Sequence, residues 1–235
     1  FSLFCIELTY LPIFVILLSC YVHILLQYLL KNKIFVHFVL DPIVFAGTSV
    51  EGSFAARYGC LVLIEKVEQL QIGALVSIRG VGRVKILDFK QVQPYLTGEV
   101  IPLIDKFSSE TAELSSKVLG LKSALFTLNS LEIKLKAPQE ALLQTRSMNS
   151  LLWAEKNINF DSAKNFIPLM TERLSFVGLQ PVSGNTQSEV QALQNAKLKA
   201  MDTKDTLERL DISMVLVKKN ISMVAAKLAI QSLEV

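Results

Sequence analysis

Residues 60–104 contain a close series of short apolar and alternating runs, which constrains the fold more than any other stretch. The run 60–67 starts apolar on both faces and ends in alternation, and the runs 74–79, 83–89 and 96–101 follow it. Alternating charged and apolar residues are typical of a strand with one face in water. We therefore expect four short strands in an antiparallel all-β unit.

Two local signals separate these expected strands. Gly80-Val81-Gly82 divides the second strand from the third, as a hairpin or a β-bulge would. A proline cannot donate a hydrogen bond to a ladder, so we expect the fourth strand to begin after Pro94.

The same residues resemble a known family. The pattern begins with Gly80, Gly82 and Arg83, continues through an alternating strand, and ends in Pro94-Tyr95-Leu96 and Val100-x-x-Leu103. It is similar to the LON domain, the N-terminal, substrate-binding domain of Lon-type ATP-dependent proteases, and most like a free-standing plant LON-domain protein. Val84 departs from the family pattern, which usually has an aromatic there. The resemblance covers about residues 45–106, and an unrelated β-meander is the alternative.

After Asp105 the apolar period changes to that of helices. Two long stripes recur at steps of three and four residues, and they comprise Leu114, Val118, Leu121, Leu125, Leu128, Leu131 and Leu135, then Leu207, Leu210, Met214, Val217, Ile221, Val224 and Leu228. Each stripe must be buried, and the two can pair with each other or with another chain as a coiled coil.

Shorter helical signals lie between the two stripes. Pro138 ends or kinks the first long helix, and a second helix is expected over 139–156. A further apolar face covers 166–179. Thr186 and Glu189 have the spacing of a capping box, and Asp202-x-x-Asp205 is a weaker cap for the last helix.

The C-terminal half also resembles the LON family, whose helical subdomain carries a Glu-Arg-Leu signature. Glu208, Arg209 and Leu210 stand in the corresponding order. The expected fold is therefore α+β, an antiparallel β-meander or partial β-barrel over residues 45–106 followed by a helical bundle over 107–235 with a long C-terminal helix.

The first 44 residues form a hydrophobic leader with two interpretations. Residues 8–30 contain no Asp, Glu, Lys or Arg, which meets the criterion for a membrane-spanning helix. Alternatively, the leader is a gene-model artefact, either a mis-predicted exon or a retained intron that has been translated. Under either interpretation the first β-layer of a LON domain is missing or replaced. The chain begins at Phe1 rather than Met, which indicates a fragment.

Composition and motifs argue against nucleic-acid binding, metal binding and nucleotide binding. The formal net charge is +3 with scattered basic residues, so nucleic acid is not an expected partner. The three cysteines lie far apart, which disfavours a zinc site or a disulfide scaffold. Gly47 and Gly52 have the spacing of a phosphate-binding loop, but the required Lys is absent. We expect no cofactor, no metal and no catalytic residues.

The resemblance implies a non-catalytic protein that binds protein substrates or partners in an ATP-dependent proteolysis system. Two alternatives stay open: the N-terminal fragment of a complete Lon-type serine protease, and a membrane-anchored coiled-coil scaffold. A homo-oligomer through the helices is a further expectation, and membrane contact is expected only through residues 8–30. Family analogy suggests the chloroplast, with the cytoplasm as the alternative.

Overall fold

The structure is a computed structural model of the 235-residue chain, and it describes residues 14–16, 34–38, 41–43, 53–55, 58–69, 74–91, 97–106, 112–136, 145–157, 166–182 and 185–233. The protein is α+β, with an antiparallel sheet followed by helices. It divides into two compact units. Unit 1 comprises Phe1–Ile104 and Phe160–Ile167, and unit 2 comprises Asp105–Asn159 and Pro168–Val235.

Unit 1 is built around a five-stranded antiparallel sheet in the order β1-β6-β5-β2, with β7 also paired to β6. A separate pair joins β3 to β4. Among the described strands no pairing closes the sheet, so it is an open antiparallel sheet and not a closed barrel. The strands are β1 (Phe14–Ile16), β2 (Ile34–Phe38), β3 (Asp41–Ile43), β4 (Ser53–Ala55), β5 (Tyr58–Gln69), β6 (Ala74–Gln91) and β7 (Thr97–Leu103).

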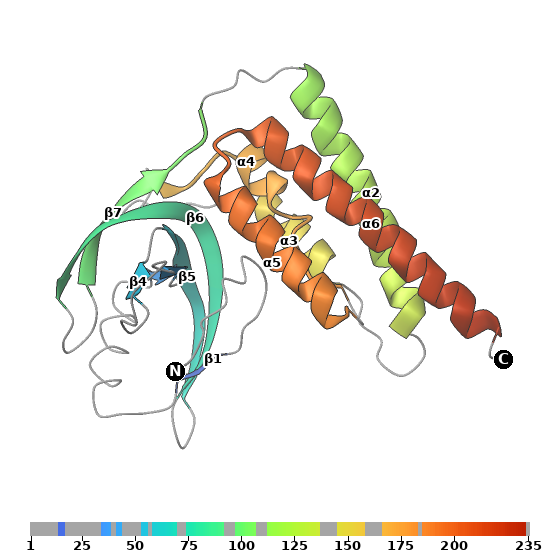
Figure 1. Ribbon diagram of the computed structural model, residues 1–235, viewed down its shortest axis with the longest axis horizontal. Helices are drawn as coiled ribbons and strands as arrows, with labels where there is room; N and C mark the ends of the chain where they lie inside the picture. The colour runs from blue at the N-terminus through green and yellow to red at the C-terminus, as the bar shows by residue number, and fades with distance from the viewer. Residues whose placement is uncertain are drawn as a thin grey trace. The chain divides into compact units, whose positions relative to one another are not determined.

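β6 is one continuous strand of 18 residues where the sequence predicts two strands. Its pairing with β5 shifts register, because Leu61 lies opposite Gly82 and Val62 lies opposite Gly80. Val81 is therefore the extra residue of a β-bulge, and the hairpin interpretation of this tripeptide is wrong. A bulge bends a strand without ending it, and Figure 1 shows β6 as a strongly curved ribbon.

The core of unit 1 follows from the composition of β5. Its buried apolar side chains are Cys60, Leu61, Val62 and Ile64 of β5, together with Val81 and Val84 of β6. The run from Cys60 confirms that β5 begins apolar on both faces, and the exposed Glu65 and Lys66 show where alternation with water begins. β7 pairs antiparallel with the second half of β6, as predicted, and places Arg83 opposite Leu103.

Parts of the expected leader belong to the sheet rather than to a separate segment. β1 pairs with the start of β6, and β2 pairs with β5. Of the expected membrane span 8–30, only Phe14–Ile16 are described, and these residues are extended rather than helical. The other residues of that span lie outside the described part of the chain. None of the described helices has the length and hydropathy needed to cross a bilayer.

Unit 2 contains two long helices that pack against each other, α2 and α6. The two predicted apolar stripes meet in one cluster, in which Leu121 and Leu125 of α2 and Val217 of α6 are buried. Internal pairing of these stripes is thus confirmed, because each covers the other. The helices of this unit are α2 (Ala112–Lys136), α3 (Arg146–Glu155), α4 (Met170–Ser175), α5 (Gln187–Asp202) and α6 (Thr206–Leu233) (Figure 1).

Side-chain caps set where α5 and α6 begin. The predicted capping box is confirmed: Thr186 Oγ1 accepts from the backbone N–H of Glu189, and the Glu189 carboxylate accepts from that of Thr186. Asp205 Oδ1 accepts from the backbone N–H of Leu207 at 2.8 Å and so caps α6.

Two of the predicted helices have different limits in the structure. Thr145 Oγ1 accepts from the backbone N–H of Met148, so α3 begins at Arg146 rather than at residue 139. Residues 137–144 lie outside the described part. The apolar segment 166–179 contains only the six-residue helix α4, because Pro168 precedes it and a turn follows Ser175.

Two glycines of unit 2 face opposite packing situations. A Cβ on Gly178, in the segment after α4, would lie 2.9 Å from the backbone oxygen of Ser213 and 2.9 Å from Val217 Cγ2. A Cβ on Gly120, inside α2, would meet only the flexible tip of Met214, at 3.4 Å. Gly178 must lack a side chain because the chain approaches α6 closely there, whereas Gly120 has room for a Cβ.

We expect Gly178→Ala and Gly120→Ala to change stability in opposite directions. Gly178→Ala should lower the free energy of unfolding by about 1–3 kcal/mol, because it overpacks a closed contact. Gly120→Ala should raise it by about 0.5–1 kcal/mol, because alanine is the better helix former. Urea unfolding followed by circular dichroism measures both. Equal effects of the two substitutions would contradict the assigned packing.

Candidate functional site

The residues singled out from the sequence that the structure describes fall into two groups. Gly80, Gly82 and Arg83 lie in β6 of unit 1, and Glu208, Arg209 and Leu210 lie in the first turns of α6 in unit 2. Pro94, Tyr95 and Leu96 lie outside the described residues.

The glycine-arginine group shapes the sheet. Gly80 and Gly82 flank the bulge residue Val81, and Arg83 lies opposite Cys60 on β5. Arg83 is only 3% exposed. A buried arginine is not placed to receive a ligand from solvent, and the two glycines lie at the bulge that bends β6.

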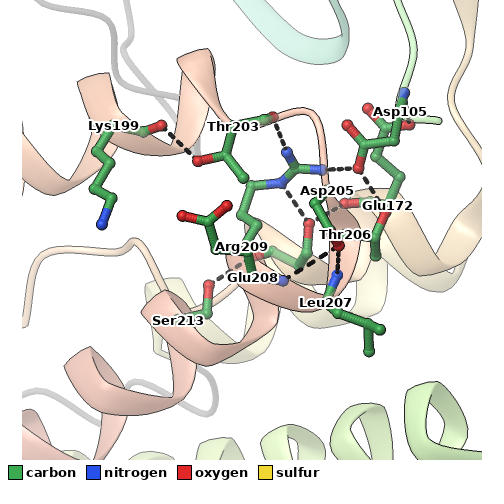
Figure 2. Close-up of polar contacts among 11 residues, drawn as sticks. Asp105, Glu172, Lys199, Thr203, Asp205, Thr206, Leu207, Glu208, Arg209 and Ser213 are labelled. Atoms are coloured by element: carbon green, nitrogen blue, oxygen red, sulfur yellow. Dashed lines mark hydrogen bonds and ion pairs between the residues drawn. The ribbon is translucent and has the colours of Figure 1, made fainter.

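Arg209 is the centre of a buried polar network in unit 2, shown in Figure 2. Its guanidinium is fully buried, and each of its three nitrogens has a different partner. Nε donates to Ser175 Oγ at 2.7 Å, and Nη1 donates to the backbone oxygen of Thr203 at 2.6 Å. Nη2 forms an ion pair with Asp105 Oδ2. The ring of Phe176 lies 4.3 Å from the guanidinium carbon, in cation–π geometry.

Asp105 connects this arginine to the segment that precedes α2. Its Oδ2 also accepts from Thr206 Oγ1 at 2.5 Å, and its backbone N–H donates to Glu172 Oε2 at 3.2 Å. The next residue, Lys106, donates its backbone N–H to the backbone oxygen of Lys204. The Asp105 segment is therefore attached both to α4 and to the turn between α5 and α6.

Hydroxyl groups complete the network around the arginine. Ser175 Oγ accepts from Arg209 and donates to the backbone oxygen of Glu172 at 2.6 Å. Ser213 Oγ donates to the backbone oxygen of Ser175. Thr203 Oγ1 donates to the backbone oxygen of Lys199 at 2.9 Å, which closes the end of α5. This arrangement joins α4, α5 and α6, and its central side chains Arg209, Ser175 and Ser213 are fully buried.

The three residues of the Glu-Arg-Leu triplet have three different environments. Glu208 is exposed, Arg209 is at the centre of the network, and Leu210 is buried in the apolar cluster of α2 and α6. Consecutive helical positions point about 100° apart, so one tripeptide reaches solvent, a polar network and the core.

Sequence reasoning missed the partners of Arg209. Asp105, Ser175 and Thr203 are separated from it by 104, 34 and 6 positions. None of these residues forms a recognisable motif.

The described residues offer little acid–base or metal chemistry. Burial raises the pKa of the Cys60 thiol to about 12, so this cysteine is not an activated nucleophile. Burial lowers the pKa of His37, which favours the neutral imidazole. No group of three or more His, Cys, Asp and Glu side chains that could hold a metal ion occurs in the described part of the chain.

An exposed surface lies where β7 pairs with β6, and we define it by Lys85, Leu87, Glu99 and Ile101. Lys85 lies opposite Ile101, and a second register shift between Ile86 and Asp88 makes Leu87 an extra residue. Bulges re-aim side chains, and Leu87 is 53% exposed while Ile101 is 42% exposed. This β6–β7 surface therefore presents two apolar side chains to solvent.

Charged residues frame the β6–β7 surface. Lys90 lies 3.0 Å from Asp88 and 3.3 Å from Glu99, and its hydrogen bonds to these carboxylates raise its pKa. These exposed pairs are worth little in stability. They keep the apolar patch small and its rim polar, as in many protein-binding sites.

No protein-family model matches the sequence, and no curated protein matches it significantly.

We expect removal of either member of the Arg209–Asp105 pair to destabilise the protein strongly. Arg209→Met or Asp105→Leu alone should lower the free energy of unfolding by about 3–5 kcal/mol, because each leaves a buried charge without its partner. The double variant should lose less than the sum, with a coupling of about 1–3 kcal/mol.

Equilibrium unfolding in urea measures this cycle. Glu208→Gln is the matched control, because it changes an exposed neighbour and should alter stability by at most about 0.5 kcal/mol. Strictly additive single-variant effects would show that the two side chains do not act as a pair.

Proposed function

We propose that this chain is a non-catalytic protein-binding module that takes up an extended segment of another protein along the free edge of β7. Its role would be the one that the LON resemblance implies, namely recognition of protein substrates or partners in an ATP-dependent proteolysis system. The observation that carries the proposal is an edge of β7 that no other described strand pairs with, beside the exposed Leu87 and Ile101.

The edge of β7 is suited to main-chain pairing. Among the described strands β7 pairs only with β6, so one of its two edges has no strand partner there. Pro102 lies in β7, and proline is found on edge strands because it cannot donate to a second ladder. An added strand would gain main-chain hydrogen bonds from this edge.

Side chains beside the edge would provide selectivity. Successive residues of an added strand point to opposite faces, so every second side chain would lie toward the β6–β7 surface. Leu87 and Ile101 favour an apolar side chain, and Glu99 and Lys90 favour a polar or charged flank. We therefore infer that the preferred segment is extended, with alternating apolar residues, and not helical.

The proposal predicts that Leu87→Glu and Ile101→Glu weaken peptide binding without unfolding the protein. Fluorescence anisotropy with labelled, unstructured peptides of about ten residues, long enough to form one strand, measures the affinity. We expect each substitution to raise Kd at least about 10-fold, because it places a charge against an apolar side chain.

Two controls make this experiment specific. Leu169→Glu changes a comparably exposed leucine in unit 2 and should leave Kd unchanged. Two peptides, each N-methylated at every second residue but on opposite edges, provide the other control. Only the peptide whose methylated nitrogens face β7 should bind more weakly, because only that edge of the peptide pairs with β7. Absence of any peptide binding, or binding that neither substitution changes, would contradict the proposed function.

A further inference from the structure

α2 carries a second stripe that α6 does not cover, and we call it the outer stripe. Its seven members recur at steps of four and three residues along the whole helix, and every one is exposed and uncharged: Ala112, Ser116, Leu119, Ser123, Phe126, Ser130 and Ile133. Leu119 is 70% exposed and Phe126 is 55% exposed. Steps of three and four are the spacing of a coiled-coil seam.

Large and small residues alternate in the outer stripe. Each of Leu119, Phe126 and Ile133 is followed or preceded by a serine at the next stripe position. The structure contains a shallow hollow here, lined by Leu119, Lys122, Ser123, Phe126, Thr127 and Ser130. A serine between two large side chains leaves room for a large side chain from outside.

We propose that a second copy of this chain docks on the outer stripe, with the two α2 helices antiparallel. One register places every large residue over a serine: Leu119 faces the partner's Ser130, Phe126 faces the partner's Ser123, and Ile133 faces the partner's Ser116. In this register Phe126 would enter the partner's hollow. The same register overlaps the two helices over nearly their full length of about 37 Å. The pairing of large residues with serines and the greatest helix overlap therefore select the same register.

Charge at the ends of α2 favours the antiparallel arrangement, and Glu113 also lies 3.4 Å from Lys117 of its own helix. The first turn of α2 is acidic through Glu113, and the exposed Lys134 lies near its other end. Antiparallel pairing brings each Glu113 to the basic end of the partner helix, and it also opposes the two helix dipoles. Parallel pairing would place like charges together at both ends.

The charged residues nearest the stripe are already compensated within one chain. Lys122 lies 2.5 Å from Glu155, and Lys117 lies 2.8 Å from Asp211. Docking therefore need not bury an unpaired cation. A single helix stripe is at or below the lower end of the roughly 1,200–2,000 Å² that stable interfaces bury, so we expect a weak, reversible dimer.

Sedimentation velocity of the full chain over a range of concentrations tests this proposal, which does not depend on the proposed function of unit 1. We expect the wild type to pass from monomer to dimer. Phe126→Glu should weaken association at least about 10-fold, because it charges the centre of the interface. Val215→Glu is the matched control, because Val215 is 67% exposed on α6 and outside the stripe, and it should leave association unchanged.

A second variant fills the hollow instead of charging it. Ser123→Phe should also prevent docking, because the partner's Phe126 would lose its space, and an exposed position tolerates the larger residue. Thermal unfolding shows whether either variant remains folded. A chain that stays monomeric at the highest concentration, or a dimer that neither folded variant weakens, would overturn the proposal.

Thiol cross-linking then tests the orientation, in a background with Cys5 and Cys20 replaced by Ser. In the proposed register, two Ser123→Cys side chains lie about 5 Å apart along the helix axes, whereas two Ser130→Cys side chains lie about 16 Å apart. A short bis-maleimide should therefore join the first variant and not the second. Equal cross-linking of both would indicate parallel helices and would contradict the antiparallel pairing.

Discussion

The buried ion pair between Arg209 and Asp105 is the interaction on which the helical unit depends. A charged group inside a protein is stable only when it is paired and its remaining hydrogen bonds are made. The guanidinium meets this condition through three segments at once, at Asp105, Ser175 and Thr203. The network therefore requires α4, the α5–α6 turn and the segment before α2 to occupy defined places together, and apolar packing of α2 on α6 alone does not require this.

The second constraint is that a long helix has more than one face. α2 uses one apolar stripe against α6, where Leu121 and Leu125 are buried with Val217. The outer stripe, on another side, remains uncharged and exposed at Leu119 and Phe126. In a helix that only had to remain in water, charged residues would be expected there. One stripe of α2 therefore stabilises unit 2 internally, and the other leaves an uncharged face exposed.

In the sheet, bulges have the comparable effect. The bulge at Val81 lets β6 continue through a bend, so one strand can pair with β1, β5 and β7 along its length. The bulge at Leu87 turns an apolar side chain toward solvent beside the edge of β7. The polar network of unit 2 is buried, whereas apolar side chains are exposed on the β6–β7 surface and on the outer stripe of α2. This distribution supports a role in binding proteins.

The sequence by itself determined the elements with strong local signals. The alternating runs predicted the pairing of β6 with β7, the stripes predicted two long helices that each bury one apolar face, and Thr186 with Glu189 predicted the start of α5. These features depend on residues close together in the chain or on a repeated period. Only the tertiary structure decided that Gly80-Val81-Gly82 is a bulge and that Arg209 pairs with Asp105 across 104 positions. A glycine pair permits both a turn and a bulge, and no local pattern states which distant carboxylate will neutralise a buried arginine.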